Sequence, residues 1–330
     1  MILNPAIIAL LLSSFLLSGM ILYSAYFGLQ ILRRWDIKSG SETQLGLERR
    51  TYLISTILSY AFAFQLISLF LFVYTADNLH TIFSGAMCAA GTLNVNRFGY
   101  PALVLKIISF LTAGLWLILN HADNRGYDYP LIKKKYLLLI IIAPVFLTET
   151  VIITIYLLSL RADVITSCCG ALFSPQKEGF ISEIVSLPPS VARLLFFTSI
   201  PATILSGLYF YKSKKGIYIF SSLSVISFII SIVSIISFIS LYIYELPTHH
   251  CPFCILQREY NYIGYLLYTS LFVATLCGMG AGILNPFKGR ESLKEIIPHL
   301  QKRLTIISIM ALLIFLIVSV YPIMSSDFKL

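Results

Sequence analysis

Long apolar stretches alternate with short polar loops along the whole chain. Eight of these stretches contain few charged residues and reach the length of about 20 residues that a helix needs to cross the hydrocarbon core of a bilayer. A chain inside lipid must satisfy its own backbone hydrogen bonds, so each stretch is predicted to be a helix. The predicted spans cover residues 2–32, 51–74, 101–119, 136–160, 191–211, 217–244, 262–284 and 304–321.

The composition supports this prediction. Hydrophobic residues make up 58% of the chain and charged residues 12%, whereas about a quarter of the residues in soluble domains are charged. We therefore predict an all-α, polytopic transmembrane helical bundle in contact with the lipid bilayer, formed as a single integral membrane domain over residues 1–330. The net charge of +9 does not indicate a nucleic-acid partner, because the basic residues lie between the spans.

The basic residues are divided unevenly between the two sets of loops. Seventeen of the 24 Lys and Arg residues fall in the first, third, fifth and seventh loops, and six fall in the other loops and the termini. Loops rich in Lys and Arg stay in the cytoplasm, so both termini are predicted to lie outside the cell (inner) membrane. No basic residue precedes Arg33, and the first stretch is therefore predicted to be a retained helix rather than a signal peptide.

Five of the six cysteines are predicted to lie in or beside the outer loops. They are Cys88, Cys168, Cys169, Cys251 and Cys254, while Cys277 falls inside a span. Thiols in an oxidising compartment form disulfides unless they are catalytic or bind metal. We expect the three cysteine-bearing turns to meet at one periplasmic rim of the bundle, as structural bridges, a redox relay or a metal site.

The segment CPFC, residues 251–254, is the most specific motif in the chain. Pro252 suits the first turn of a helix, so both sulfur atoms are expected at a helix N-terminus, where the helix dipole lowers the pKa of a thiol. Arg258 is then expected on the same helical stripe, close to the thiols. Thiol exchange is expected to begin at Cys251, with Cys254 resolving the mixed disulfide. A structural disulfide is the alternative.

The sequence CPFCILQR, residues 251–258, resembles the Cys-x-x-Cys-Ile-x-x-Arg spacing of the disulfide bond formation protein B family, membrane thiol oxidases that reduce quinone. The resemblance covers only the surroundings of the sixth and seventh spans. It implies that Cys251 and Cys254 form a redox pair at the periplasmic end of a helix and that Arg258 lies near a bound quinone. That family has four helices and a separated second cysteine pair in one loop, whereas this chain has eight predicted spans and adjacent cysteines at 168 and 169.

The remaining outer residues leave a metal site open. Adjacent cysteines cannot readily bridge each other, because the ring that would result is strained. Soft thiolates bind Cu(I) and zinc, and the vicinal pair is also similar to that of mercuric transport proteins. The candidate metal ligands are Cys88, Cys168, Cys169, His249 and His250. Structural pairing of the vicinal cysteines with Cys88 or Cys251 is equally open.

Glu149 lies near the middle of the fourth span. An ionisable side chain at that depth costs about 2.5 kcal/mol or more, which makes it a candidate for carrying protons. The alternative is a neutral Glu149 that is hydrogen-bonded inside the bundle by Lys106 or Gln65. Lys106 itself is expected to extend its ammonium group to the membrane interface.

Three functions fit these residues. The leading hypothesis is a membrane thiol–disulfide oxidoreductase or electron-transfer protein, in which Cys251 and Cys254 exchange electrons with a periplasmic thiol protein and a membrane quinone, aided by Cys168 and Cys169. The first alternative is a protein that handles or transports copper, mercury or haem at the outer face. The second is a structural subunit that docks on other membrane subunits.

Overall fold

The computed structural model describes residues 4–37, 39–161, 163–166 and 188–326, and within them the regular structure is helical throughout. Eight of its helices are long and apolar enough to cross a membrane. Many large apolar side chains on these helices point outward, including Phe15, Tyr60 and Ile67. Such surfaces suit lipid rather than water. The chain is therefore a multi-pass membrane protein, as predicted.

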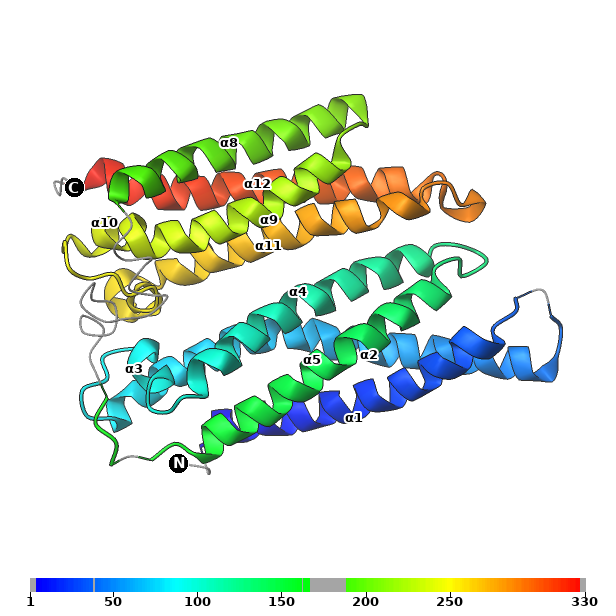
Figure 1. Ribbon diagram of the computed structural model, residues 1–330, viewed down its shortest axis with the longest axis horizontal. Helices are drawn as coiled ribbons and strands as arrows, with labels where there is room; N and C mark the ends of the chain where they lie inside the picture. Colours follow the sequence, from blue (N-terminus) through cyan, green and yellow to red (C-terminus); the bar gives the residue numbers. More distant parts are fainter. Residues whose placement is uncertain (1–3, 38, 162, 167–187, 327–330) are drawn as a thin grey trace. The chain divides into compact units, whose positions relative to one another are not determined.

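The chain divides into two compact units, and their helices are shown in Figure 1. Unit 1 comprises Met1–Thr75, Asn96–Leu160 and Ile283–Leu300, and unit 2 comprises Ala76–Val95, Arg161–Gly282 and Gln301–Leu330. Each unit is described by itself below. The expectation of a single integral membrane domain remains a prediction.

Unit 1 is built mainly from α1 (Pro5–Arg34), α2 (Glu42–Asn78), α4 (Gly99–Asp123) and α5 (Ile132–Leu158). The first helix starts at a proline, whose missing N–H costs nothing there, and the side chain of Asn4 accepts a hydrogen bond from the amide of Ala6 at 2.9 Å. Aromatic rings fill the core: the ring of Phe62 lies 5.1 Å from that of Trp116 and 5.3 Å from that of Phe146. The short 3-10 helices η5 (Asn285–Phe287) and η6 (Glu291–Leu293) also belong to this unit.

Unit 2 contains α8 (Pro189–Ser213), α9 (Ile217–Ser234), α11 (Ile263–Ile283) and most of α12 (Ile296–Ser325). The π-helical turn η2 (Ile235–Ile239) and α10 (Ser240–Tyr244) continue α9, so the sixth predicted span is one apolar stretch with an irregular final third. The ring of Phe196 packs on the rings of Phe238 and Phe315, 5.7 and 5.9 Å away.

Four short elements of unit 2 lie in the loops that contain Cys88, Cys251 and Cys254. They are η1 (Leu79–Ile82), α3 (Ala89–Leu93), η3 (Cys254–Leu256) and η4 (Arg258–Tyr260).

All eight predicted spans coincide with observed helices, and the observed helices extend further at several ends. The largest extension is that of α2, which begins at Glu42 instead of residue 51. The polar first turns of α2 explain the difference, because no apolar pattern marks them. The orientation of both termini stays a prediction.

Candidate functional site

The CPFC segment lies in a compact loop between α10 and α11. The sequence placed its cysteines at the start of an α-helix, and this is wrong: Cys254 begins the single turn η3, and α11 starts only at Ile263. The backbone of Gln257 is extended (ψ 164°), and Asn261 and Tyr262 have φ values of 52° and 56°, so the chain cannot continue as a helix from the cysteines. The helix-dipole argument for reactive thiols therefore does not apply here.

Two tyrosine hydroxyls hold the CPFC turn. The hydroxyl of Tyr244, at the end of α10, donates to the carbonyl oxygen of Cys251 at 2.5 Å and accepts from the amide of Ile255 at 3.0 Å. The hydroxyl of Tyr268, in the second turn of α11, donates to the carbonyl oxygen of Pro252 at 2.6 Å. These bonds satisfy backbone groups that no regular secondary structure would satisfy.

A glycine lets α11 approach this turn. A Cβ atom on Gly264 would lie 2.8 Å from the carbonyl oxygen of Ile255, which is closer than real Cβ contacts. Residue 264 therefore has to lack a side chain for the turn to pack where it does.

Cys88 is supplied by a second loop of unit 2. It immediately precedes α3, and its carbonyl oxygen accepts from the amide of Gly91 at 3.0 Å. A carboxylate oxygen of Asp77 accepts from the amide of Ala89 at 3.1 Å. The Nε2 group of Gln257 donates to the same oxygen at 3.2 Å and to the carbonyl oxygen of Met87 at 2.8 Å. Gln257 thereby ties the loop of the cysteine pair to the loop of Cys88.

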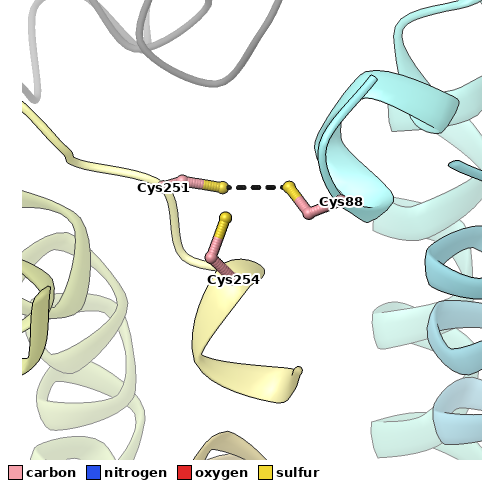
Figure 2. Close-up of side chains that lie close together, drawn as sticks. All are labelled: Cys88, Cys251 and Cys254. Carbon is pink, nitrogen blue, oxygen red and sulfur yellow. Dashed lines mark hydrogen bonds between the residues drawn. The ribbon is translucent and has the colours of Figure 1, made fainter. Parts of the chain in front are cut away.

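The three cysteine side chains point toward one another (Figure 2). The Sγ atoms of Cys88 and Cys251 are 3.4 Å apart although the residues are separated by 163 positions in the sequence. All three sulfur atoms, including that of Cys254, lie within 4.8 Å of one another. We call Cys88, Cys251 and Cys254 the cysteine cluster. Two of the three turns that were expected to converge do so.

The cluster is buried. Cys88 and Cys251 have no exposed surface, and Cys254 is 5% exposed. The expectation that thiol exchange begins at Cys251 is not supported by accessibility, because Cys251 is fully buried and Cys254 is the more exposed residue of the pair.

Cys168 and Cys169 lie outside the described residues. The chain that leads to them is anchored on the loop of Cys88: the amide of Thr166 donates to the carbonyl oxygen of Ser84 at 2.9 Å, and its hydroxyl donates to that of Gly91 at 3.1 Å. Gly85 makes this contact possible, because its φ of 84° and its close approach to the carbonyl oxygen of Thr166 both exclude a side chain.

The two histidines that precede the pair flank the cluster without joining it. The ring of His249 packs edge-on against the ring of Tyr244, with centroids 4.4 Å apart, and Nδ1 of His250 donates to the carbonyl oxygen of Ile236 at 2.9 Å. Burial lowers the pKa of His249 below its ordinary value, and the nearby Cys88 acts in the opposite direction. Burial also lowers the pKa of His250, against the effect of its bond to Ile236. Both shifts favour the neutral form of the ring.

Arg258 lies on the exposed turn η4. It does not share an α-helical stripe with the cysteines, contrary to the expectation from spacing, because η3 and η4 are separate 3-10 turns with the extended Gln257 between them. Its assignment as a quinone-binding residue remains a prediction.

Glu149 belongs to unit 1, where it forms a buried ion pair. A carboxylate oxygen lies 2.8 Å from Nζ of Lys106, and Nε2 of Gln65 donates to both carboxylate oxygens at 2.9 Å. Nζ of Lys106 also donates to the hydroxyl of Ser68 at 2.9 Å. The partners suggested for Glu149 are thus confirmed, whereas the expectation that Lys106 reaches the interface is wrong: it is 1% exposed.

A second buried ion pair in unit 1 was not anticipated. Nζ of Lys135 lies 2.7 Å from a carboxylate oxygen of Asp123 and donates to Asn120 at 2.9 Å. The sequence placed Lys135 in a loop, since it ends a run of three lysines, but it lies in the first turn of α5. Tyr244, Tyr268 and Gln257 were likewise missed. The only signal for Gln257 was its position within the CPFCILQR segment, and the tyrosines resembled ordinary interface residues.

Comparisons with known proteins found no significant match: no family model matches the chain, and neither a curated protein nor a solved structure does.

Proposed function

We propose that this chain is a membrane thiol–disulfide oxidoreductase whose reactive centre is the cysteine cluster. The observation that supports the proposal is the contact of 3.4 Å between the sulfur atoms of Cys88 and Cys251, beside the Cys251–Cys254 pair. Exchange proceeds when a thiolate attacks one sulfur of a disulfide and displaces the other, so the three participating sulfurs must be neighbours. Three cysteines whose sulfur atoms lie within 4.8 Å of one another meet this requirement.

The exchange begins at Cys254, which is 5% exposed, whereas Cys88 and Cys251 are fully buried. Its thiolate attacks an external disulfide, forms a mixed disulfide and releases one external thiolate. The thiolate of Cys251 then attacks the Cys254 sulfur, which forms the Cys251–Cys254 disulfide and releases the second external thiolate. One external disulfide has become two thiols, and two cluster thiols have become one disulfide, so the electrons balance.

Cys88 transfers the disulfide from the Cys251–Cys254 pair to the fully buried Cys88–Cys251 pair. Its thiolate attacks the Cys251 sulfur, the Cys88–Cys251 bond forms, and Cys254 leaves as a thiolate that is ready for another partner. The cycle closes when a second dithiol reduces the cluster by the same steps in reverse. The resemblance at residues 251–258 implies a quinone near Arg258, which fits the opposite direction of exchange. Two cluster thiols then give two electrons and two protons to the quinone, and the cluster disulfide that results oxidises an external dithiol to a disulfide. Cys168 and Cys169 are proposed as further exchange partners.

The cluster is proposed to face the periplasm. The support is the excess of Lys and Arg in the alternate loops, which predicts that the loops of Cys88 and Cys251 lie outside. A periplasmic thiol protein is then the exchange partner that fits this location.

The test uses the purified full-length protein in detergent, equilibrated in buffers of reduced and oxidised glutathione. After acid quenching and alkylation, mass spectrometry is expected to find the Cys251–Cys254 and Cys88–Cys251 disulfides in proportions that follow the glutathione ratio. The Cys251→Ser variant should accumulate glutathione on Cys254. The Cys277→Ser variant is the matched control, because Cys277 is a buried cysteine in α11 outside the cluster. If the cluster stays reduced at every glutathione ratio, the proposal is wrong.

A further inference from the structure

The triangle of sulfur atoms has the dimensions of a metal site. The sulfur of Cys88 lies 3.4 Å from that of Cys251, and all three pairs lie within 4.8 Å (Figure 2). Three thiolates bound at about 2.3 Å around one ion in a plane lie about 4 Å from one another. The observed range encloses this value, so small changes in side-chain torsion angles would bring all three sulfurs to one ion.

Burial adds a charge argument. With 5% or less of each cysteine exposed, the cluster lies outside bulk water. Neighbouring thiolates in such a place repel one another, and desolvation further disfavours their ionisation. A bound cation removes both costs, because it compensates the charge of the thiolates at the point where they converge. The reduced cluster is therefore suited to a cation that prefers sulfur.

The kind of donor favours one cation class. Among the described residues, the group whose ligand atoms lie within 4.8 Å of one another consists of three cysteines, and the rings of His249 and His250 are not part of it. Zn(II) is a borderline-soft ion that also takes imidazole and carboxylate ligands. Cu(I) is softer and prefers thiolates.

We propose that the reduced cysteine cluster binds one Cu(I) ion through the Sγ atoms of Cys88, Cys251 and Cys254. The ligands are held in advance: Tyr244 fixes the backbone of Cys251, and Gln257 ties the loop of the pair to the loop of Cys88. Such second-layer bonds orient the ligands of metal sites.

A regulatory consequence rests on the proposed function. When an external disulfide converts Cys251 and Cys254 into a disulfide, two of the three donors are lost and the ion leaves. Conversely, a bound ion occupies the thiolates that would attack the external disulfide. Copper and thiol exchange then compete for the same sulfur atoms.

The test titrates the full-length protein, reduced with a phosphine and kept without oxygen, with Cu(I) in the presence of bathocuproine disulfonate as competitor. One Cu(I) per chain is expected to resist the competitor, and X-ray absorption at the copper edge should show three sulfur neighbours. The Cys88→Ser variant should lose at least 100-fold in affinity, whereas the Cys277→Ser control should retain the wild-type value. The absorption measurement needs only the wild-type protein, so misfolding of a variant cannot hide the answer.

Two results would overturn the copper site. One is the absence of retained Cu(I) in the wild-type protein; the other is a parallel titration with Zn(II) and a zinc indicator in which one Zn(II) per chain binds while Cu(I) is lost to the competitor. The glutathione assay without metal decides the exchange function separately. Copper binding without exchange would reject the oxidoreductase and keep the metal site, and exchange without copper binding would do the reverse.

Discussion

Tyr244 shows how one hydroxyl can shape the candidate site. It donates to the carbonyl oxygen of Cys251 and accepts from the amide of Ile255, so a single side chain bridges the two ends of the CPFC turn. Its ring also supports His249. Because the turn has no regular secondary structure before η3, these side-chain contacts satisfy backbone groups that hydrogen bonds within a helix or sheet would otherwise satisfy.

The Tyr244→Phe variant should loosen this turn. Two buried backbone groups lose their partner, which costs about 1–3 kcal/mol. We expect N-ethylmaleimide to modify Cys251 and Cys254 of the reduced protein faster, by about tenfold if the cost is close to 1.4 kcal/mol, as measured by timed alkylation and mass spectrometry. Tyr218→Phe is the control, since Tyr218 is 56% exposed on α9. Equal labelling of the wild type and Tyr244→Phe would contradict the role of the hydroxyl.

At the scale of elements, buried polar side chains join the helices of unit 1. Lys106 of α4, Glu149 of α5 and Gln65 of α2 meet in one network, and Ser18 of α1 lies 2.6 Å from Thr150 of α5 through their hydroxyl oxygens. An ion pair at this depth is not in itself a large source of stability, because desolvation opposes the attraction. We expect the ion pair to contribute mainly to the choice of which helix faces pack together.

Breaking this ion pair from one side should be worse than removing it. Lys106→Met or Glu149→Leu alone leaves one buried charge without compensation and should destabilise the protein by about 3–5 kcal/mol. The double variant should recover most of that loss. The measurement is a double-mutant cycle on the free energy of unfolding in detergent. Additive losses in the double variant would show that the two side chains do not depend on each other.

Unit 2 carries a serine face along α9. Ser224, Ser227, Ser231 and Ser234 follow one another at intervals of three and four residues, and all are buried. The hydroxyl of Ser227 lies 2.6 Å from that of Thr203 and donates to the carbonyl oxygen of Ser199 at 3.1 Å. Among the described residues, the hydroxyl of Ser231 has no such partner. The buried hydroxyls of Ser227 and Ser231, one turn apart on α9, are therefore expected to affect the stability of the protein in opposite directions.

Alanine substitutions should reveal this difference. Ser231→Ala removes a buried hydroxyl whose desolvation is not repaid, so the thermal unfolding temperature should stay equal or rise. Ser227→Ala removes the hydrogen-bond partner of Thr203. This variant should have a lower thermal unfolding temperature, and its free energy of unfolding should fall by about 1 kcal/mol. The matched pair lies on one helix and is compared in the same detergent. A drop for Ser231→Ala as large as that for Ser227→Ala would mean that Ser231 is hydrogen-bonded after all.

At the scale of the whole molecule, the uneven distribution of Lys and Arg between the loops predicts how the chain is oriented in the membrane. Finding Lys135 in a buried ion pair takes one cation out of the third loop, but the excess of Lys and Arg in the alternate loops persists. The predicted topology therefore does not depend on that residue. It places the loop after α10 outside and the loop after α11 inside.

Two introduced cysteines test this orientation. Glu245 and Gly289 are both exposed, the first just after α10 and the second after η5. In intact cells a membrane-impermeant maleimide should label the Glu245→Cys variant strongly above the wild type and the Gly289→Cys variant only after permeabilisation. The reverse pattern would invert the topology and move the cysteine cluster to the cytoplasmic side.

The sequence by itself determined the eight apolar helices of this protein. Helix formation inside lipid is a local matter, because each segment satisfies its own backbone hydrogen bonds, and a run of apolar residues is sufficient to reveal it. The sequence also identified the cysteines as candidate site residues, but the prediction that CPFC begins a helix was wrong. No pattern of spacing reports that positive φ values at Asn261 and Tyr262 will delay α11.

Only the tertiary structure decided which cysteines meet. The contact between Cys88 and Cys251 joins positions 163 residues apart, and it depends on the packing of short turns that Tyr244 and Gln257 hold. The position of the Lys106 side chain was also decided by the tertiary structure. Its place near the end of its span predicted that it reaches the membrane interface, but its ion-pair partner Glu149 on α5 holds it inside unit 1. Such contacts are set by which helix faces pack together, and that information is spread over the whole chain rather than written in any one segment.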